Sequence, residues 1–316
     1  MERRWWPKLL SPASRAFRRE AQRTPNYSRF DLLHGYVYAR WPYLYIGIGT
    51  GEHWIARRLG PVVGWLGRLL PYQAGENGDG NTWAEGYHGK VVPLEAATQL
   101  VTIQEEIDLR DLEQVIPYAR ARDIVLQHPD HIVALECPCR SVRASPCQPL
   151  DVCLIVGEPF ASFILDHHPR RARWITPEEA VGILRAEDER GHVHHAFFKD
   201  AMLGRFYAIC NCCACCCGAM QAHQNGTPML AASGYVSRVD AELCVGCGLC
   251  ADSCQFCAIS VLDGVAVVEA GSCMGCGVCV SQCVEGAVAL VREPAKGVPL
   301  EIRELVGGTF TEPLKH

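Results

Sequence analysis

Two cysteine motifs near the carboxyl end of the sequence constrain this chain more than any other feature. Each follows the pattern C-x2-C-x2-C-x3-C, and the second motif repeats the first 29 residues later. Thiolate is the soft ligand that iron–sulfur clusters require, and spacers of two residues let a curled loop direct successive sulfurs toward one cluster. The repeated pattern therefore predicts two cluster-binding loops. Their cysteines are Cys244, Cys247, Cys250, Cys254, Cys273, Cys276, Cys279 and Cys283.

Residues 235–292, which contain both motifs, resemble the bacterial-type ferredoxin that carries two [4Fe–4S] clusters. In that family the fourth cysteine of each motif ligates the cluster of the other motif. The resemblance implies a first cluster held by Cys244, Cys247, Cys250 and Cys283. It implies a second cluster held by Cys273, Cys276, Cys279 and Cys254.

The chain around these motifs agrees with the fold of that family. Strands are predicted at residues 235–240 and 287–291, and a hairpin at 258–269 turns at Asp263-Gly264. The glycines between the ligands are expected to let backbone amides approach the sulfurs. Proline usually follows the fourth cysteine in this family, but the two positions are Gln255 and Val284 here. Hydrogen bonding near the clusters is therefore expected to differ.

A second group of cysteines lies upstream of the ferredoxin motifs. Six thiols occur within eight residues, and no Asp, Glu, Lys or Arg lies between residues 206 and 237. Neighbouring cysteines rarely meet disulfide geometry, and a packed core would use less oxidisable side chains. Metal or cluster binding is therefore predicted for Cys210, Cys212, Cys213, Cys215, Cys216 and Cys217.

Four further cysteines follow or begin apolar runs that read as strands, at residues 131–136 and 153–157. A structural zinc site or unrelated buried thiols are alternatives to cluster binding for this set. The four residues are Cys137, Cys139, Cys147 and Cys153. Together with the six-cysteine run they predict one or two further clusters, with nuclearity left open. Cys257 lies outside both sets.

Residues 85–292 as a whole resemble a group of uncharacterised ferredoxin-domain proteins from anaerobes. The shared parts are a strand ending in Cys137, the Cys147–Cys153 spacing, a helix opened by a capping box at Thr176, and the run from Cys210 to Cys217. The resemblance implies that these parts occur together, and it implies no settled activity.

The composition favours an intracellular iron–sulfur protein. The chain has 316 residues, of which 49% are hydrophobic, so it can form two or three domains. Its 19 cysteines are odd in number and occur at metal-ligand spacings, which argues against a secreted disulfide scaffold. A reducing cytoplasm, as in an anaerobe, is expected. The net charge of −5 gives no reason to expect a nucleic-acid partner.

The predicted fold class is α+β, with a C-terminal two-cluster ferredoxin-like domain after a mixed helix/strand, cysteine-rich module. Residues 1–30 are expected to be poorly ordered, residues 73–89 to form a loop, and residues 93–104, 117–127 and 177–189 to form helices. The histidines near 167 and 192–195 are read as surface or core residues. The expected segments are 1–70 (basic, aromatic-rich, helical), 71–130 (loop plus helices), 131–234 (cysteine-rich α/β module), 235–295 (ferredoxin domain) and 296–316 (tail).

Positive charge is concentrated in the first 70 residues, which hold 12 Lys and Arg against 4 Asp and Glu. Residues 54–70 mix tryptophan, aliphatic side chains and arginine, so a peripheral contact with a membrane surface or a partner is open. A helix pair docked on the protein body is the favoured interpretation. No segment reaches the roughly 18 apolar residues of a membrane span.

The leading functional hypothesis is an electron-transfer protein with two [4Fe–4S] clusters, at least one further cluster and a redox protein as partner. No nucleophile triad, P-loop or paired acid/base site is evident. A catalytic iron–sulfur reductase, with its substrate at a Cys210–Cys217 cluster, is the first alternative. A metal-handling thiol protein is the second. The sequence predicts no catalytic residue and leaves the oligomeric state open.

Overall fold

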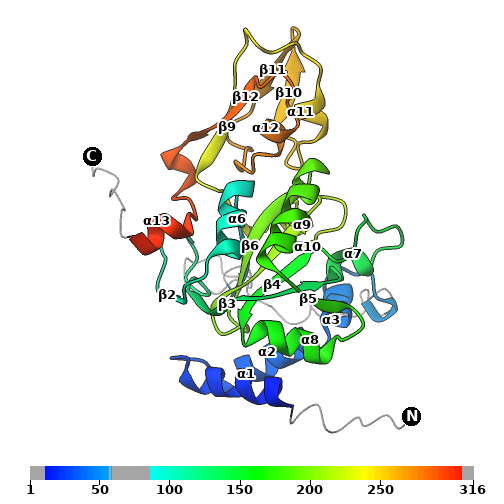
Figure 1. The fold of residues 1–316 in the computed structure, drawn as a ribbon. Helices are drawn as coiled ribbons and strands as arrows, with labels where there is room; N and C mark the ends of the chain where they lie inside the picture. Colours follow the sequence, from blue (N-terminus) through cyan, green and yellow to red (C-terminus); the bar gives the residue numbers. More distant parts are fainter. Residues whose placement is uncertain (1–10, 57, 59–85, 308–316) are drawn as a thin grey trace, which may run out of the picture.

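The computed structural model describes residues 11–56, 58 and 86–307, which form a large body and a smaller C-terminal lobe (Figure 1). We call residues 11–234 the body and residues 235–292 the C-terminal lobe. The predicted basic stretch of residues 1–10 and most of residues 54–70 lie outside the described residues.

The body is built on an eight-stranded sheet with strand order β2-β3-β4-β7-β6-β1-β8, and β5 pairs with the end of β3 on the edge opposite β4. All of its pairings are antiparallel except that of β1 with β8. The strands are β1 (Tyr87–Val91), β2 (Ile107–Leu109), β3 (Ile124–Leu135), β4 (Cys153–Glu158), β5 (Ala172–Ile175), β6 (Val193–Lys199), β7 (Arg205–Cys212) and β8 (Leu230–Ala231).

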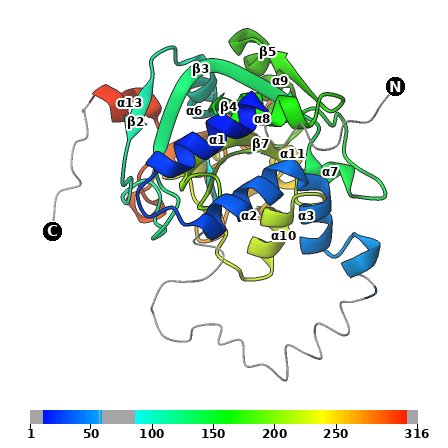
Figure 2. The ribbon, with the colours of Figure 1, turned by 90° about the horizontal axis from the view of Figure 1, so that it is seen from below.

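Both faces of this sheet are covered, which explains why its central strands read as continuous apolar runs. Alternate residues of β3 and β4 enter two separate cores, so that Val133 and Ile155 lie on one face and Ala134 and Leu154 on the other. The first face is covered by helices α1 (Pro12–Arg23), α2 (Arg29–Arg40), α8 (Phe160–His167) and α10 (Gly218–Gln224). Helices α1, α2 and α8 lie below the sheet in Figure 1 and in front of it in Figure 2. The second face is covered by α6 (Leu94–Thr102), α9 (Pro177–Glu189) and α13 (Ile302–Gly307).

Several predicted elements are confirmed. Helix α9 spans the predicted residues, and the Thr176 side chain accepts a hydrogen bond from the Glu179 amide at its start. Helix α6 and strands β3 and β4 lie where their apolar patterns predict them. The expected helix at 117–127 is wrong, because Ile124 begins the long strand β3 and joins the sheet core. The expected loop at 73–89 is wrong at its end, where Tyr87 begins β1.

Two further expectations about the ends of the chain are wrong for the described residues. Residues 11–23 are ordered, because the Ser11 side chain caps α1 and Phe17 is buried against α8. The predicted tail after residue 296 contains α13, whose Ile302 and Leu305 enter the core beside α6. Helix α3 (Pro42–Gly49) continues the predicted helical character of the N-terminal segment.

The C-terminal lobe repeats one local geometry. Strand β9 (Tyr235–Val239) pairs with β12 (Val288–Arg292), and β10 (Ile259–Leu262) pairs with β11 (Val265–Val268) across the predicted Asp263-Gly264 turn. After each motif's second cysteine, a glycine with positive φ precedes a short helix. These helices are α11 (Leu249–Asp252) after Gly248 and α12 (Val278–Ser281) after Gly277. The 29-residue sequence repeat is thus also a repeat of backbone conformation.

Candidate metal centres

The C-terminal lobe brings the first predicted ligand set to one small cavity. Cys244, Cys247 and Cys250 line this cavity together with Cys283, the fourth cysteine of the other motif. The Ala266 amide donates a hydrogen bond to the Cys244 sulfur at 3.4 Å, so β11 supports this loop. Amide hydrogen bonds of this kind stabilise thiolate ligands and tune the potential of a cluster.

The second predicted set is also drawn together across the motifs. Cys254 packs beside Cys273, and it is an electrostatic neighbour of Cys276 and Cys279. Burial raises the pKa of Cys279 to about 11, while a hydrogen bond with Ser237 opposes the shift. The Ala258 amide donates to the Cys254 sulfur at 3.2 Å, and the Ser237 hydroxyl lies 3.0 Å from the Cys279 sulfur. The crossed arrangement therefore fits two separate groups of four thiols.

Two glycines of the motifs are required by close backbone contacts. A Cβ on Gly246 would lie 2.2 Å from the Gly264 carbonyl oxygen in the β10–β11 turn. A Cβ on Gly275 would lie 2.2 Å from the Tyr235 carbonyl oxygen of β9. The sequence predicts that these glycines let backbone amides approach the cysteine sulfurs. The structure adds a second reason, which is the packing of each loop against a neighbouring strand or turn.

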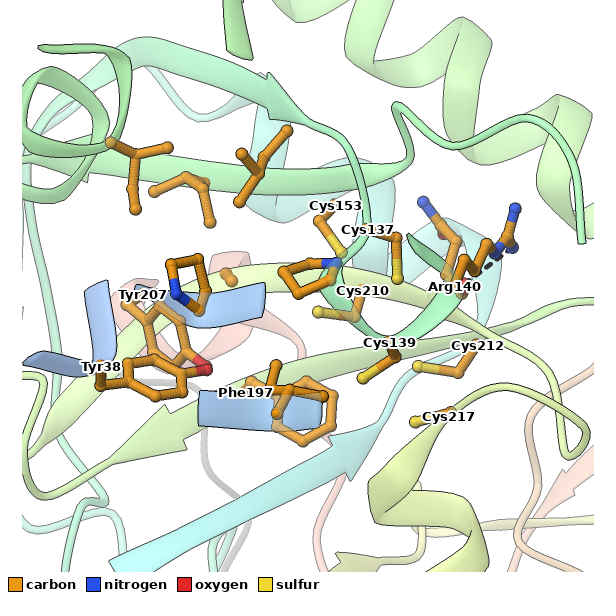
Figure 3. A pocket seen from close by; sticks show the side chains of 18 of the residues that line it. Tyr38, Cys137, Cys139, Arg140, Cys153, Phe197, Tyr207, Cys210, Cys212 and Cys217 are labelled. Carbon is orange, nitrogen blue, oxygen red and sulfur yellow. Dashed lines mark hydrogen bonds between the residues drawn. The ribbon is translucent and has the colours of Figure 1, made fainter. Parts of the chain in front are cut away.

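In the body, eight of the ten upstream cysteines line one buried cavity on the first face of the sheet (Figure 3). Two of them, Cys213 and Cys216, also belong to a tighter group described below, and the cavity is named here for the other six, as the six-thiol cavity. Strand β4 supplies Cys153, and its cross-strand partner on β7 is Cys210. Because side chains alternate along a strand, Cys212 returns to the same face. The remaining three thiols lie at helix ends, since Cys137 and Cys217 precede α7 (Pro138–Ser141) and α10, and Cys139 lies within α7.

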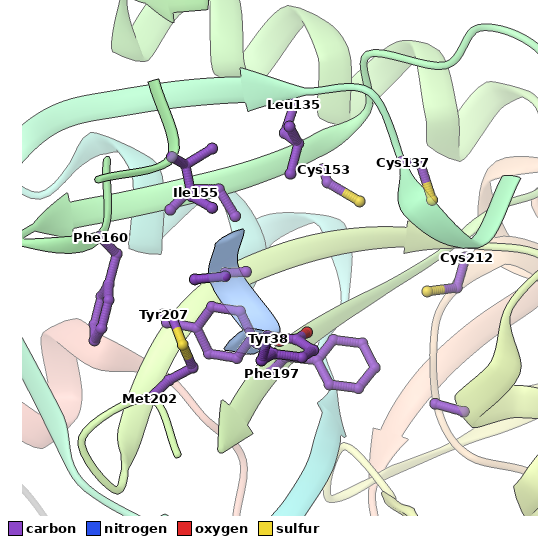
Figure 4. Packing of buried hydrophobic residues seen from close by; sticks show 14 of the residues in the cluster. Tyr38, Leu135, Cys137, Cys153, Ile155, Phe160, Phe197, Met202, Tyr207 and Cys212 are labelled. Carbon is purple, nitrogen blue, oxygen red and sulfur yellow. The ribbon is translucent and has the colours of Figure 1, made fainter. Parts of the chain in front are cut away.

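The wall opposite these sulfurs is aromatic and apolar. Tyr38, Tyr207 and Phe197 face the thiols across the cavity, and the two tyrosine hydroxyls are 2.7 Å apart (Figure 3). The same residues belong to the core that fills this face of the sheet (Figure 4). A group bound among the six sulfurs would therefore be shielded from water, which lowers the local dielectric and tunes a redox centre.

Burial and mutual hydrogen bonds disfavour negative charge on these thiols when no cation is present. The pKa of Cys137 is raised to about 12, chiefly by its hydrogen bond with Cys139. That of Cys153 is raised well above its usual value by hydrogen bonds with Cys137 and Cys210. At Cys212 the hydrogen bond with Cys217 lowers the pKa, but burial and neighbouring thiols outweigh it and raise the pKa to about 12. Bound metal ions supply the positive charge that several thiolates at such a site require.

A buried ion pair fixes the short helix α7, which contains Cys139 and begins directly after Cys137. The Arg140 guanidinium is 1% exposed and lies 2.6 Å from a Glu187 carboxylate oxygen on α9. It also donates to the carbonyl oxygens of Pro149 and Asn211. Removing one partner of such a pair leaves a buried charge without compensation, so both residues hold this region in place.

The other four upstream cysteines form a tighter group beside the cavity, and two of them, Cys213 and Cys216, also line the cavity wall. The sulfurs of Cys147, Cys213, Cys215 and Cys216 all lie within 4.8 Å of one another. The Cys147 sulfur is 3.2 Å from that of Cys215 and 3.6 Å from that of Cys213. Burial opposes ionisation of Cys215, but hydrogen bonds with the other three thiols lower its pKa. The six-cysteine run thus contributes to two different sites.

The C-terminal lobe contacts the body close to this tight group. The Gln255 side chain accepts a hydrogen bond from the Ala214 amide at 2.9 Å and donates to the Gly191 carbonyl oxygen at 3.0 Å. Met274 and Val278 are buried in the core that also surrounds the six-thiol cavity. The ring of Phe256 lies edge-on to that of His223 on α10. The lobe carrying the ferredoxin motifs is therefore packed directly against the upstream cysteine sites.

Sequence reasoning found the cysteines but missed several residues around them. It recognised Gln255 as a departure from proline, yet it expected an effect through the backbone amide, whereas the side chain links the lobe to the body. The histidines lie within the body as expected, with His192 bonded to Glu187 and His194 to Asn211. Strand β6, which carries His194 and His195, is an interior strand of the sheet. Tyr38 and Lys199 carried no local signal, because only the fold brings them to the cavities.

Each cysteine that the sequence predicts as a ligand belongs to one of the sets described above. Cys257, outside them, is exposed with a positive φ of 52°. Within the described residues, no helix is both long and apolar enough to cross a membrane.

Comparison with known protein families yields a match to the 4Fe-4S binding domain, over residues 237–260. This range contains the whole first motif, from Cys244 to Cys254. No curated protein and no solved structure matches the chain. The family match identifies a ferredoxin-type iron–sulfur segment with at least one [4Fe–4S] cluster and supports a role in electron transfer.

Proposed function

We propose that this chain is an iron–sulfur electron-transfer protein with two [4Fe–4S] clusters in the C-terminal lobe and one further cluster in the six-thiol cavity of the body. The ligands would be Cys244, Cys247, Cys250 and Cys283 for the first cluster, and Cys273, Cys276, Cys279 and Cys254 for the second. The third would be held among Cys137, Cys139, Cys153, Cys210, Cys212 and Cys217. Such clusters accept and release single electrons with little rearrangement.

The observation that carries the proposal is the direct packing of the lobe on the body. Cys276 and Met274 of the second motif pack against the same core as Cys212 and Cys217 of the cavity. A protein that only stored metal would have no need for this shared apolar core between two thiol sites. The core excludes water from the space between them, and this is the environment in which electron transfer between fixed centres proceeds with little reorganisation. A redox protein is the proposed partner, and the reducing cytoplasm is the proposed compartment.

Anaerobic analysis of iron and acid-labile sulfide tests the proposal. The full chain should hold more than the roughly eight irons of two cubanes. Cys153 and Cys210 are partners on the adjacent strands β4 and β7. Replacing Cys153→Ser and Cys210→Ser together should remove iron and sulfide in equal amounts, because a cubane contains as many sulfides as irons. The exposed Cys257→Ser variant is the matched control and should retain both.

Two outcomes would contradict the third cluster. Equal iron and sulfide in the cavity variant and the wild-type chain would mean that the cavity holds no cluster. Loss of metal without loss of sulfide would instead favour the thiol-store alternative.

A second pocket favours the reductase alternative as the second candidate function. It has a volume of about 300 Å³ and shares Tyr38, Tyr87 and Cys139 with the six-thiol cavity. Lys199 lines it, is only 3% exposed and lies 4.6–4.7 Å from the ring centroids of Tyr87 and Tyr38. Burial lowers its pKa to about 8. Among the described residues no hydrogen-bond acceptor contacts its ammonium group, so the group can receive a small anionic substrate.

This candidate predicts anion binding that depends on Lys199. The test adds nitrite, sulfite or acetate, one at a time and in millimolar excess. At least one of these anions should raise the melting temperature of the holoprotein. The Lys199→Gln variant should lose that increase, because amide and ammonium have similar size but only the ammonium is charged. Lys90→Gln is a suitable control, since Lys90 is also buried but lies outside this pocket. An increase that is the same in the Lys199→Gln protein would exclude Lys199 as the anion site.

A further inference from the structure

The tight group formed by Cys147, Cys213, Cys215 and Cys216 differs in spacing from every other cysteine site in the described residues. Its sulfurs all lie within 4.8 Å of one another, and no other set of three or more cysteines there is so compact. The two ferredoxin sets and the six-thiol cavity, where clusters are proposed, are therefore more widely spaced. The same molecule thus contains two kinds of thiol site, the widely spaced sets and the compact group.

The spacing agrees with one metal ion rather than a cluster. In a tetrahedral tetrathiolate with bonds of about 2.3 Å, neighbouring sulfurs are about 3.8 Å apart. The Cys213–Cys147 and Cys215–Cys216 sulfurs are 3.6 and 3.7 Å apart, and those of Cys147 and Cys215 are 3.2 Å apart. In a cubane each thiolate binds a different iron, so the width of the cluster adds to the separation of the sulfurs. Four sulfurs this close leave no room for four irons and four sulfides.

From these distances we infer that Cys147, Cys213, Cys215 and Cys216 bind a single tetrahedral metal ion, either zinc or iron. Four thiolates are typical of closed sites for either metal, with no position left for substrate. On binding, the thiols lose their protons to solvent and no electron is transferred. This inference goes beyond the proposed electron-transfer function and does not depend on it.

The surroundings of the site supply structural support for such an ion. Cys213 and Cys216 are 3% exposed, and Cys215 is exposed at the surface. The Arg143 guanidinium donates to the Cys216 carbonyl oxygen at 3.0 Å and to the Gln221 side chain at 2.6 Å. The guanidinium also pairs with the Glu52 carboxylate at 2.7 Å, so its role is to hold the turn that carries Cys216. The proposed ion would thus lie among two buried thiols and one exposed thiol, with a guanidinium nearby.

The position of the site gives the ion a structural consequence. Residues 142–152 form an irregular segment, and Cys147 is the thiol through which it meets the turn at residues 213–217. The Ala214 amide in that turn binds Gln255 of the C-terminal lobe. One ion would therefore fasten the irregular segment to the turn on which the lobe rests.

Metal analysis of the full chain, purified anaerobically, tests this inference. The Cys147→Ser and Cys215→Ser double variant should lose one equivalent of zinc, or of iron that has no matching sulfide. Acid-labile sulfide should stay unchanged. Cys257→Ser is the control, since it removes an exposed thiol outside the site. Unchanged metal content, or loss of iron together with equal sulfide, would overturn the inference.

A measurement on the wild-type chain keeps the inference testable if the double variant does not fold. Where zinc is found, X-ray absorption at the zinc edge should give four sulfur neighbours at about 2.3 Å. Where zinc is absent, the Mössbauer spectrum should contain one mononuclear iron beside the cluster irons. A chain with neither signal holds no single ion and contradicts the inference. The cavity variant Cys153→Ser and Cys210→Ser should retain the ion, so failure of the proposed third cluster would be distinguished from failure of this site.

Discussion

At the scale of single residues, the position directly after the fourth cysteine has a different role in each motif. It is Gln255 in the first motif and Val284 in the second. Both depart from the proline usual in the resembled ferredoxins. Gln255 contacts the body through two side-chain hydrogen bonds, whereas Val284 is 80% exposed. The residue after the fourth cysteine therefore docks the lobe on the body in the first motif, whereas in the second it is largely exposed beside the cavity of the first ligand set.

This contrast predicts different effects of the same substitution. Gln255→Ala leaves the Ala214 amide and the Gly191 carbonyl oxygen without their partners, which costs about 1–3 kcal/mol for a fully buried group and less for the partly exposed Ala214. Hydrogen exchange at the Ala214 amide should become faster. Val284→Ala is the matched control and should leave that exchange unchanged. Slow exchange at Ala214 in the Gln255→Ala protein would mean that this contact does not hold the lobe.

At the scale of elements, the cluster loops of the C-terminal lobe are shaped by the strands and turns behind them. Gly246 and Gly248 both have positive φ and both lie between ligands of the first motif. Only Gly246 lies against another segment, the turn at Gly264, while a Cβ on Gly248 would meet nothing within 4 Å. The loop and the β10–β11 hairpin must therefore fold together.

Alanine at these two positions should separate crowding from backbone strain. Gly246→Ala forces the loop away from the hairpin and should remove about four irons, the content of one cubane. Gly248→Ala adds only the cost of a left-handed conformation, about 1–2 kcal/mol, and should keep its iron. Iron content after anaerobic purification measures both. Full iron in the Gly246→Ala protein would show that the hairpin can move aside.

At the scale of the whole molecule, the lobe and the body share one apolar core. Val278 is 1% exposed and Met274 is 8% exposed because the body covers them. All eight proposed ferredoxin ligands nevertheless lie within the lobe. Residues 235–295 alone should therefore reconstitute about eight irons, and lose them faster than the full chain because the apolar contacts are missing. Four or fewer irons after anaerobic reconstitution would contradict two clusters.

The sequence alone determined the features that depend on local pattern. The C-x2-C-x2-C-x3-C repeat predicted the lobe, the Asp263-Gly264 turn predicted its hairpin, and the Thr176 cap predicted helix α9. These signals are local because ligand spacing, turn conformation and capping each involve residues only a few positions apart. The same is true of the apolar runs of β3 and β4, although the start of β3 was mistaken for a helix.

Only the tertiary structure decided how the ten upstream cysteines divide. Of the adjacent residues Cys212 and Cys213, only Cys213 joins the tight group, because Cys212 ends β7 on the cavity face whereas Cys213 begins the turn that meets Cys147. No spacing rule along the chain could separate them, since Cys147 and Cys153 come from an irregular segment and a strand far away in sequence. The pairing of β4 with β7 brings Cys153 to Cys210, and the irregular segment brings Cys147 to Cys215. Those long-range contacts depend on burial of the whole sheet, and local sequence does not encode them.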